Sequence, residues 1–588
     1  MSIRLASARA ALVAFALATL ALLVGPRLAG QSGAPDRAAG PYIARGEEVS
    51  ITNIDVVVTD SKGKRVTGLK KEDFVVFEDG IDQPVTNFYA VEQGHILLPA
   101  EEPPSAPAVP AAPTAPAAPG APPAAAAAPQ PAPKTRIVFF VDNLHILPFD
   151  RNRVLRNVET FVRDNVKGDV EGMIITFNRT LKVRRKFTND GRDLSDVLKQ
   201  IEEESALGTN AASDKRDVIQ AIDEATSADS AIYRVRSYAQ AIENDLSFTF
   251  DAMKTTINQL SGVEGRKILV HVSGGLPQSP GAELWTYVQT KFPNSVSYSM
   301  GQFEFDKTAS YLGIIQAANA AGVSMYTIDA SGLSADTNVS AENRATSQHL
   351  DTFVERTNLQ SMLTLMAEET GGRATLNRND VLVPLKEMEK DYTSYYSLGY
   401  RSVRSGIDRP HKVDVRLKSK KGLTVLARRS YLEKGVDTKV REAVTSALFF
   451  PRDDNPLGAA ITVGNPAPAE RGNFIVPVAI RVPFSRFLIP EGEKDAVKGR
   501  GRLVFYFIVV DSEGKQSDLT TQPVPVELEP RMYAASSKRD FVYDAKLIMI
   551  PGGQRLSLAI RDDITNQTSY LQKQIFVSAF AGEAPARK

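Results

Sequence analysis

The pattern of apolar and polar positions divides the chain into three kinds of segment. From Glu48 to Glu92, short apolar or alternating runs are separated by turn residues such as Asp79-Gly80, which is typical of antiparallel strands. From Arg136 to Tyr392, short apolar runs alternate with patterns of helical period. Beyond Tyr392 short strand-like runs return. This pattern predicts an α/β domain between β segments.

The stretch RIVFFVDNLHI, Arg136 to Ile146, opens the middle segment. Five apolar residues run directly into Asp142, and an unbroken run this short predicts a strand buried on both faces. A helix is expected from about Asp150 to Lys167, because its apolar residues recur at helical spacing. Asp142 therefore falls at the carboxyl end of a strand, where open α/β sheets form their binding crevice.

The rest of the middle segment repeats the alternation of strand and helix. Buried strands are expected at Glu171–Asn178, Lys267–Gly275 and Val323–Gly332, and an exposed edge strand at Leu181–Phe187. Helices are expected at Arg192–Glu204, Ser213–Ser261 (as one or two), Leu359–Thr370 and Asp380–Tyr392. Strands separated by helices predict a Rossmann-like, doubly wound, mostly parallel sheet.

The β segments on either side of the α/β domain define the expected domain boundaries. Each of the two pieces that flank the α/β domain is too small to be stable alone, so we expect them to pair into one small sandwich in which that domain is inserted. The expected divisions are a signal peptide at 1–30, an N-terminal β piece at 47–95, a Pro/Ala-rich linker at 96–134, the α/β domain at 135–392, the completing β piece at 393–435 and a C-terminal β-sandwich at 441–582.

The N-terminal residues indicate where the protein is located in the cell. Arg4 and Arg9 precede an apolar stretch from Ala10 to Val24, followed by small residues, which is the pattern of a secretory signal peptide. The stretch is shorter than the ~20 residues of a spanning helix, so cleavage is expected, with a retained anchor as the alternative. An exported protein, periplasmic or extracellular, with no membrane span after removal of the signal peptide, is predicted.

Composition excludes several kinds of chemistry. The 588 residues contain no cysteine, so disulfides, thiolate catalysis and cysteine-based zinc sites are absent. The formal net charge of +1 argues against a nucleic-acid partner. The five histidines show no H-E-x-x-H spacing, no phosphate-binding loop is present, and the HVSGGL segment lacks a nucleophile elbow. The chain is therefore not expected to be an enzyme.

Several motifs carry a family resemblance. They are VVVTDSKGKRVTGLKKEDFVVFEDG before the α/β domain, FFVDNLHI and ILVHVSGG within it, and AEETGGRATL with YYSLGYRS at its end. With these the chain from Val49 to Tyr431 resembles the von Willebrand factor A-like proteins, more narrowly their acidobacterial subfamily. The resemblance implies an exported protein with a divalent cation held at the carboxyl ends of the sheet.

The metal-binding motif of that family is incomplete here. Asp142 matches the first aspartate, but Leu144 and Ile146 stand where the two serines belong. Thr209 is a possible match for the threonine ligand, and Ser273 or Gly274 stands in place of the second aspartate. Magnesium requires near-octahedral oxygen ligands, so the site is expected to be degenerate, with no cofactor or at most a weakly held Mg²⁺ or Mn²⁺.

Two histidines leave an alternative open. His145 lies in the same loop as Asp142, and His271 lies on the neighbouring strand. A transition-metal site built from histidine and aspartate is chemically reasonable. The other interpretation is that His271 is a core residue and His145 only caps the loop.

The expected function is that of a non-enzymatic, adhesion-like module that binds a protein partner. Its partner-binding crest is predicted to comprise Asp142, Asn143, His145, Gly274 and Gly275. Two alternatives remain: a structural or assembly component of the cell envelope without a metal site, and, more remotely, a metal-assisted hydrolase.

Overall fold

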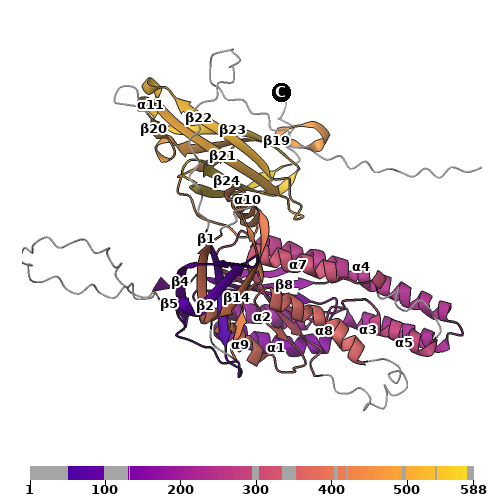
Figure 1. Cartoon of the computed structure of the whole chain (residues 1–588). Coiled ribbons are helices and arrows are strands. Elements are labelled where there is room, and N and C mark those ends of the chain that lie inside the picture. The colour runs from indigo at the N-terminus through magenta and orange to yellow at the C-terminus, as the bar shows by residue number, and fades with distance from the viewer. Residues whose placement is uncertain are drawn as a thin grey trace, which may run out of the picture. The chain divides into compact units, whose positions relative to one another are not determined.

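A computed structural model describes residues 51–97, 130–131, 133–293, 303–333, 352–402, 408–418, 422–491, 498–536 and 539–578. These residues form two compact units, one within 43–439 and one within 440–588 (Figure 1). The expected signal peptide lies outside the described residues. None of the described helices combines the length and the apolar composition that a membrane crossing requires.

The centre of the first unit is a six-stranded sheet. Its strands are β7 (Thr135–Asp142), β8 (Val170–Phe177), β9 (Leu181–Thr188), β10 (Arg266–Ser273), β11 (Val323–Asp329) and β12 (Ala374–Thr375). They lie in the order β12-β11-β10-β7-β8-β9, and all neighbours are parallel except β8 and β9. This is the doubly wound order, and it reverses between β7 and β10, where such sheets place their binding crevice.

Helices cover both faces of this sheet. They are α1 (Pro148–Asn165), α2 (Gly191–Glu202), α3 (Gly208–Glu224), α4 (Ala228–Leu260), α5 (Ala282–Lys291), α7 (Thr308–Ala321), α8 (Thr352–Glu369) and α9 (Leu382–Thr393). Side chains of α1, α2 and α9 share one buried cluster with alternate residues of the strands. On the other face α7 and α8 contact β11, where the Thr327 hydroxyl donates to the Leu363 carbonyl. The mixed α/β class is thus as expected.

The helices agree with expectation in one respect and differ from it in another. The long pattern from Ser213 to Ser261, expected as one or two helices, forms two, and the Ser227 side chain caps the start of α4 by accepting from the Ser230 amide. Two further helices, α5 and α7, were not among those expected. Helices α3, α4 and α5 project from the sheet as a bundle (Figure 1) and bury a small core of their own around Trp285.

The two β pieces pair with each other directly. Their strands are β1 (Ile51–Thr59), β2 (Phe74–Glu78), β3 (Ile81–Gln83), β4 (Val85–Glu92), β5 (His95–Leu97), β6 (Gln130–Pro131), β13 (Tyr395–Arg401), β14 (Arg409–Leu417), β15 (Thr424–Leu426) and β16 (Ser430–Glu433). One sheet has the order β15-β1-β13-β4-β5-β6, and the other has the order β16-β14-β2-β3. Both sheets contribute to one buried cluster, so strands before and after the α/β domain form a single sandwich.

The ends of the expected linker are ordered. Residues 96–97 and 130–131 fall within the predicted Pro/Ala-rich linker, but they lie in β5 and β6, which pair at the edge of the first sheet. This corrects the linker bounds, because the backbone pairing of a sheet edge does not depend on an apolar pattern. The Pro/Ala segment between them lies outside the described residues.

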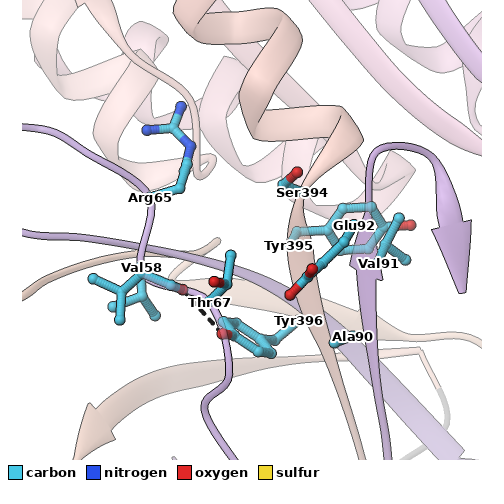
Figure 2. Close-up of a pocket in the computed structure, with 10 residues that line it drawn as sticks. Val58, Arg65, Thr67, Ala90, Val91, Glu92, Ser394, Tyr395 and Tyr396 are labelled. Atoms are coloured by element: carbon cyan, nitrogen blue, oxygen red, sulfur yellow. Dashed lines mark hydrogen bonds between the residues drawn. The ribbon is translucent and has the colours of Figure 1, made fainter. Parts of the chain in front are cut away.

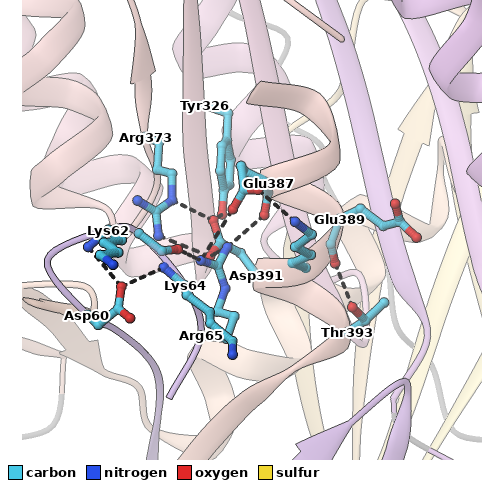
Figure 3. Close-up of polar contacts among 12 residues, drawn as sticks. Asp60, Lys62, Lys64, Arg65, Tyr326, Arg373, Glu387, Glu389, Asp391 and Thr393 are labelled. Atoms are coloured by element: carbon cyan, nitrogen blue, oxygen red, sulfur yellow. Dashed lines mark hydrogen bonds and ion pairs between the residues drawn. The ribbon is translucent and has the colours of Figure 1, made fainter. Parts of the chain in front are cut away.

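A buried carboxylate joins the sandwich to the α/β domain. Asp391 of α9 is fully buried and forms ion pairs with Arg65, from the loop after β1, and with Arg373, whose Nε lies 2.8 Å from Oδ2 (Figure 3). The Tyr326 hydroxyl of β11 donates to the same oxygen at 3.0 Å. Three segments that are distant in sequence thus converge on one charge.

The second unit is a β-sandwich. Its strands are β17 (Ala460–Val463), β18 (Ala467–Pro468), β19 (Phe474–Pro483), β20 (Ile489–Glu491), β21 (Lys498–Val510), β22 (Thr520–Leu528), β23 (Asp540–Met549), β24 (Gly552–Asp562) and β25 (Thr568–Val577). One sheet contains β17, β18, β19 and β23, the other contains β20, β21, β22, β24 and β25, and both contribute to one core. Two helices, α10 (Val436–Ala447) and α11 (Pro530–Ser536), and short 3-10 turns, η1 (Lys71–Asp73) in the first unit and η3 (Glu470–Gly472) and η4 (Phe484–Arg486) in the second, complete the described elements.

Candidate functional site

The loops that follow β7 and β10 meet at the point where the strand order reverses. The Gly274 amide donates to the His145 carbonyl at 3.0 Å. A Cβ atom at Gly274 would lie 2.5 Å from that carbonyl oxygen, so only glycine allows this approach. The two expected sequence motifs, FFVDNLHI and ILVHVSGG, therefore come together as the resemblance implied they should.

Asp142 lies at the centre of this contact and is 0 % exposed. Its Oδ1 accepts from the amides of Leu144 (3.1 Å) and His145 (3.3 Å). Its Oδ2 lies 2.9 Å from Nδ1 of His145 and accepts from the Ser273 hydroxyl at 3.3 Å. A carboxylate has about four acceptor positions, so donors from its own chain use them all.

The pKa values of Asp142 and His145 follow from this geometry. Burial alone would raise the pKa of Asp142, but the adjacent imidazole of His145 and the hydrogen bonds outweigh burial and leave that pKa lowered. Burial alone would lower the pKa of His145, but the Asp142 carboxylate leaves it raised. The two groups therefore stabilise each other as an ion pair.

This arrangement does not have the order of a nucleophilic triad. In a triad the histidine lies between serine and carboxylate and takes the proton of the serine. Here the carboxylate of Asp142 lies between Ser273 and His145, and the buried Nε2 of His145 has no partner among the described residues. The geometry holds Ser273 in place without activating it.

His271 lies on the neighbouring strand, fully buried beside the ring of Phe140 at 5.7 Å between centroids. Burial lowers its pKa to about 4, so the imidazole is neutral at pH 7. Neither ring nitrogen has a hydrogen-bond partner among the described residues, and no group of three or more histidine, aspartate or glutamate side chains there is arranged to hold a metal ion. The transition-metal alternative thus gains no ligand set from the described residues.

The two residues that replace the serines are part of the core. Ile146 is 1 % exposed and belongs to the cluster formed with α1 and α2, while Leu144 is 5 % exposed. Their side chains supply apolar burial at the two positions where the resemblance implies hydroxyl ligands.

Thr209 is near this loop but apart from the carboxylate. It is exposed in the first turn of α3, after Gly208, whose amide donates to the Ile146 carbonyl at 3.2 Å. The Leu207 amide donates to the Asn143 carbonyl at 2.8 Å. The backbone of this segment thus packs on the loop after β7, whereas the Asp142 carboxylate takes its donors from Leu144, His145 and Ser273.

The predicted crest differs in the structure from what was expected. Asn143 is 2 % exposed, and its Oδ1 accepts from the buried guanidinium of Arg151 at 3.3 Å. Gly275 is also buried, and Gly274 is only partly exposed. This corrects the expectation of an exposed crest, because the packing of neighbouring loops removes Asp142, Asn143 and Gly275 from contact with a partner.

Arg151 was not found from the sequence. Its guanidinium also donates to the carbonyls of Glu202 (3.1 Å) and Glu204 (2.7 Å), so it ties the end of α2 to the loop after β7. Burial lowers its pKa, and the two glutamates counter this. Fully buried arginines are rare, so no sequence signal could have identified it.

The exposed apolar residues at this edge of the sheet lie beside the buried site. We call Phe149, Arg153, Leu333 and Asn379 the rim patch. Phe149 and Leu333 are 76 % and 63 % exposed. The guanidinium of Arg153 lies over the Phe149 ring at 5.9 Å and donates to the Ala330 carbonyl, and the Leu333 amide donates to Asn379 Oδ1 at 3.0 Å.

A cavity in the small sandwich is too small to hold a ligand. Its volume of about 10 Å³ is that of one water molecule. Figure 2 shows its lining, and the Tyr396 hydroxyl there donates to the Val66 carbonyl at 2.9 Å. The lining residues include Val58, Arg65, Thr67, Ala90, Val91, Glu92, Ser394, Tyr395 and Tyr396.

Comparisons with known proteins assign no family. No family model matches the chain, and no curated protein matches it.

Among solved structures, an aerotolerance-related membrane protein from Bacteroides fragilis NCTC 9343 is 10 % identical over 44 % of this chain and 98 % of its own, with a TM-score of 0.22. The three N-terminal domains of the type V pili tip protein Mfa5 from Porphyromonas gingivalis are 9 % identical over 75 % of this chain and 70 % of their own, with a TM-score of 0.26. The PilB minor pilin from Streptococcus sanguinis is 10 % identical over 45 % and 62 %, with a TM-score of 0.23. At these scores the likenesses carry no argument about function.

Proposed function

We propose that the protein is an exported, non-enzymatic module that binds a protein partner, and that the rim patch is its ligand face. Export is inferred from the basic and apolar pattern of the first 30 residues. The proposal concerns the same edge of the α/β sheet as the resemblance to von Willebrand factor A-like domains, but it moves contact from the buried carboxylate to the exposed side chains beside it.

The observation that carries the proposal is the saturation of Asp142. Its carboxylate is buried and uses its acceptor positions on donors of its own chain. A metal-dependent adhesion site needs an open coordination position, and a catalytic carboxylate needs access to a substrate. Asp142 instead holds the loops after β7 and β10 together beneath the surface.

The rim patch supplies what the buried site lacks. Exposed Phe and Leu side chains beside an arginine are the residue types that contribute most to protein interfaces, where aromatic and arginine residues are enriched. Phe149, Arg153 and Leu333 belong to segments that follow two different strands, β7 and β11. The Arg153 guanidinium donates to the Ala330 carbonyl and so joins these two segments, while the Leu333 amide donates to Asn379 of the loop after β12. A fixed patch loses little conformational entropy on binding.

Site-specific photo-crosslinking tests this function. A benzophenone side chain placed at Phe149 or at Leu333 is expected to cross-link one exported protein of the source cell. An excess of the unmodified protein should compete, and the variant F149S/L333S should not. The matched control is the same photoprobe at Lys71, an exposed position of the small sandwich. Equal cross-linking at Lys71, or equal competition by F149S/L333S, would contradict the proposal.

The second candidate function is a structural or assembly component of the envelope. It is favoured by the insertion of the α/β domain into the sandwich, which Asp391 joins through buried ion pairs. Under this alternative F149S/L333S would compete for cross-linking as well as the unmodified protein does, whereas a variant disrupted at Asp391 would not compete.

A further inference from the structure

We infer that the free edge of strand β9 is a second docking surface, which accepts an extended acidic segment of a partner protein by strand addition. The inference goes beyond the proposed function, because it uses the opposite side of the sheet from β11 and none of the residues of the rim patch.

The first observation is the position of β9 in the sheet. It is the last strand in the order and pairs only with β8, so no strand among the described residues covers its outer edge. An edge strand presents alternate unpaired N–H and C=O groups, and these are the groups that an added strand satisfies.

The second observation is the charge of this strand. Its sequence, LKVRRKFT, contains four cations at Lys182, Arg184, Arg185 and Lys186. Arg184 pairs with Glu204 at 2.6 Å, and Arg185 pairs with Asp193. Lys182 and Lys186 are exposed and have no ion pair with any residue that the structure describes. Two cations on the edge are therefore available to an incoming segment.

The third observation is a shallow, solvent-open surface along the same strand, lined by residues 183–188. Val183, next to Lys182 on this strand, is 48 % exposed and provides an apolar contact. A segment that alternates acidic and apolar residues would place a carboxylate toward Lys182 and an apolar side chain against Val183. The pairing of β9 with β8 shifts register beyond Val183, so a later carboxylate of the same segment would meet Lys186.

Charge and backbone chemistry select the kind of partner. A second copy of this strand would bring lysine opposite lysine or arginine, which is destabilising across a strand pair. The phosphates of a nucleic acid could accept from the cations and from the amides of the edge, but they donate no hydrogen bond and would leave its carbonyl groups unsatisfied. An acidic peptide matches the cations, the amides and the carbonyls together.

The test measures binding of a fluorescent peptide of four Glu-Val repeats by anisotropy, using the full chain. This Glu-Val peptide is expected to bind more tightly than four Lys-Val repeats, and more tightly than the same Glu-Val peptide with alternate amides N-methylated. Hydrogen exchange should show new protection of amides within residues 181–188. Binding that is insensitive to N-methylation, or tighter binding of a twelve-nucleotide thymidine strand, would overturn the inference.

Charge reversal locates the surface. The variant K182E/K186E should weaken binding of the Glu-Val peptide by roughly tenfold or more, because two attractive contacts become repulsive. The matched control K71E/K412E reverses two exposed lysines of the sandwich and should leave binding unchanged. An unchanged dissociation constant in K182E/K186E would reject the proposal.

Two further variants keep the result interpretable. The milder K182Q/K186Q should weaken binding by less than the charge reversal, and it replaces the reversal if Trp285 fluorescence shows that K182E/K186E is unfolded. The rim variant F149S/L333S should bind the peptide as the unmodified protein does. Failure at the β9 edge is thus distinguishable from failure of the proposed function.

Discussion

His145 closes the loop after β7 onto the carboxylate of Asp142, with Nδ1 of the histidine 2.9 Å from Oδ2 of the aspartate. The side chains of the pair are 10 % and 0 % exposed. The Ser273 hydroxyl adds a third segment, from the neighbouring strand β10. A position that the family resemblance assigns to a metal ligand thus serves here to hold two loops together.

Removing the carboxylate should destabilise the first unit strongly. Asp142→Ala is expected to lower the free energy of unfolding by about 3–5 kcal/mol, because it leaves a buried imidazolium and two amides without their partner. Ser273→Ala removes one neutral donor and should cost about 1 kcal/mol. Urea unfolding followed by the fluorescence of Trp285, the single tryptophan, reports on this unit.

The control for this comparison is Asp164→Ala, at an exposed carboxylate of α1, which should change stability by less than about 0.5 kcal/mol. If Asp142→Ala and Asp164→Ala changed stability equally, Asp142 would not hold the two loops together.

Acidification should destabilise the first unit through His271. Burial lowers the pKa of this histidine to about 4, against about 6.5 in the unfolded chain. Between these values the unfolded state binds a proton that the folded state does not, so the free energy of unfolding falls as the pH falls. The difference of about 2.5 pKa units corresponds to roughly 3 kcal/mol. Urea midpoints measured with Trp285 fluorescence from pH 7.5 to pH 4 test this.

The variant His271→Leu should lose this dependence between pH 6.5 and pH 4. His145 has the opposite sign: its pKa is raised, so its contribution is present below about 6.5 and is lost as the pH rises through the folded pKa. A variant His271→Leu with an unchanged slope would show that another group titrates in this range.

Disruption of Asp391 should separate the α/β domain from the small sandwich. Asp391→Ala leaves Arg65 and Arg373 near a buried space without their counter-charge and is expected to cost about 3–5 kcal/mol. Limited proteolysis should then cut near residues 393–394, where α9 meets β13. The control Lys386→Ala, an exposed position of the same helix, should leave both stability and cleavage unchanged.

Divalent cations should not stabilise the protein. A cation that binds only the folded state raises the melting temperature in proportion to ln(1 + [L]/Kd). Because Asp142 already accepts from its own chain, millimolar Mg²⁺ or Mn²⁺ should shift the melting temperature by less than about 1 °C, and a chelator should have no effect. A rise that disappears in Asp142→Asn would instead show that the crest holds a metal after all.

The local pattern of the sequence predicts the α/β domain well. A predominantly apolar run marks each of β7, β10 and β11, because a strand covered on both faces shows little polar alternation. The alternation of the run at Leu181–Phe187 indicated the exposed edge strand that becomes β9. The size of the β pieces was also enough to suggest that they pair, since neither piece could bury a core alone.

The sequence by itself therefore determined the class of the fold, the order of most elements and the place of Asp142 at the end of a strand. Only the tertiary structure decided that Asp142 is saturated by His145 and Ser273, that Asn143 is buried by Arg151, and that Phe149 and Leu333 are exposed instead. The reason is physical: secondary structure follows from the period of neighbouring residues, whereas burial of a loop depends on which distant segments pack over it. The sequence contains Gly274, whose lack of a side chain permits close approach, but it does not show that the segment approached is the His145 carbonyl.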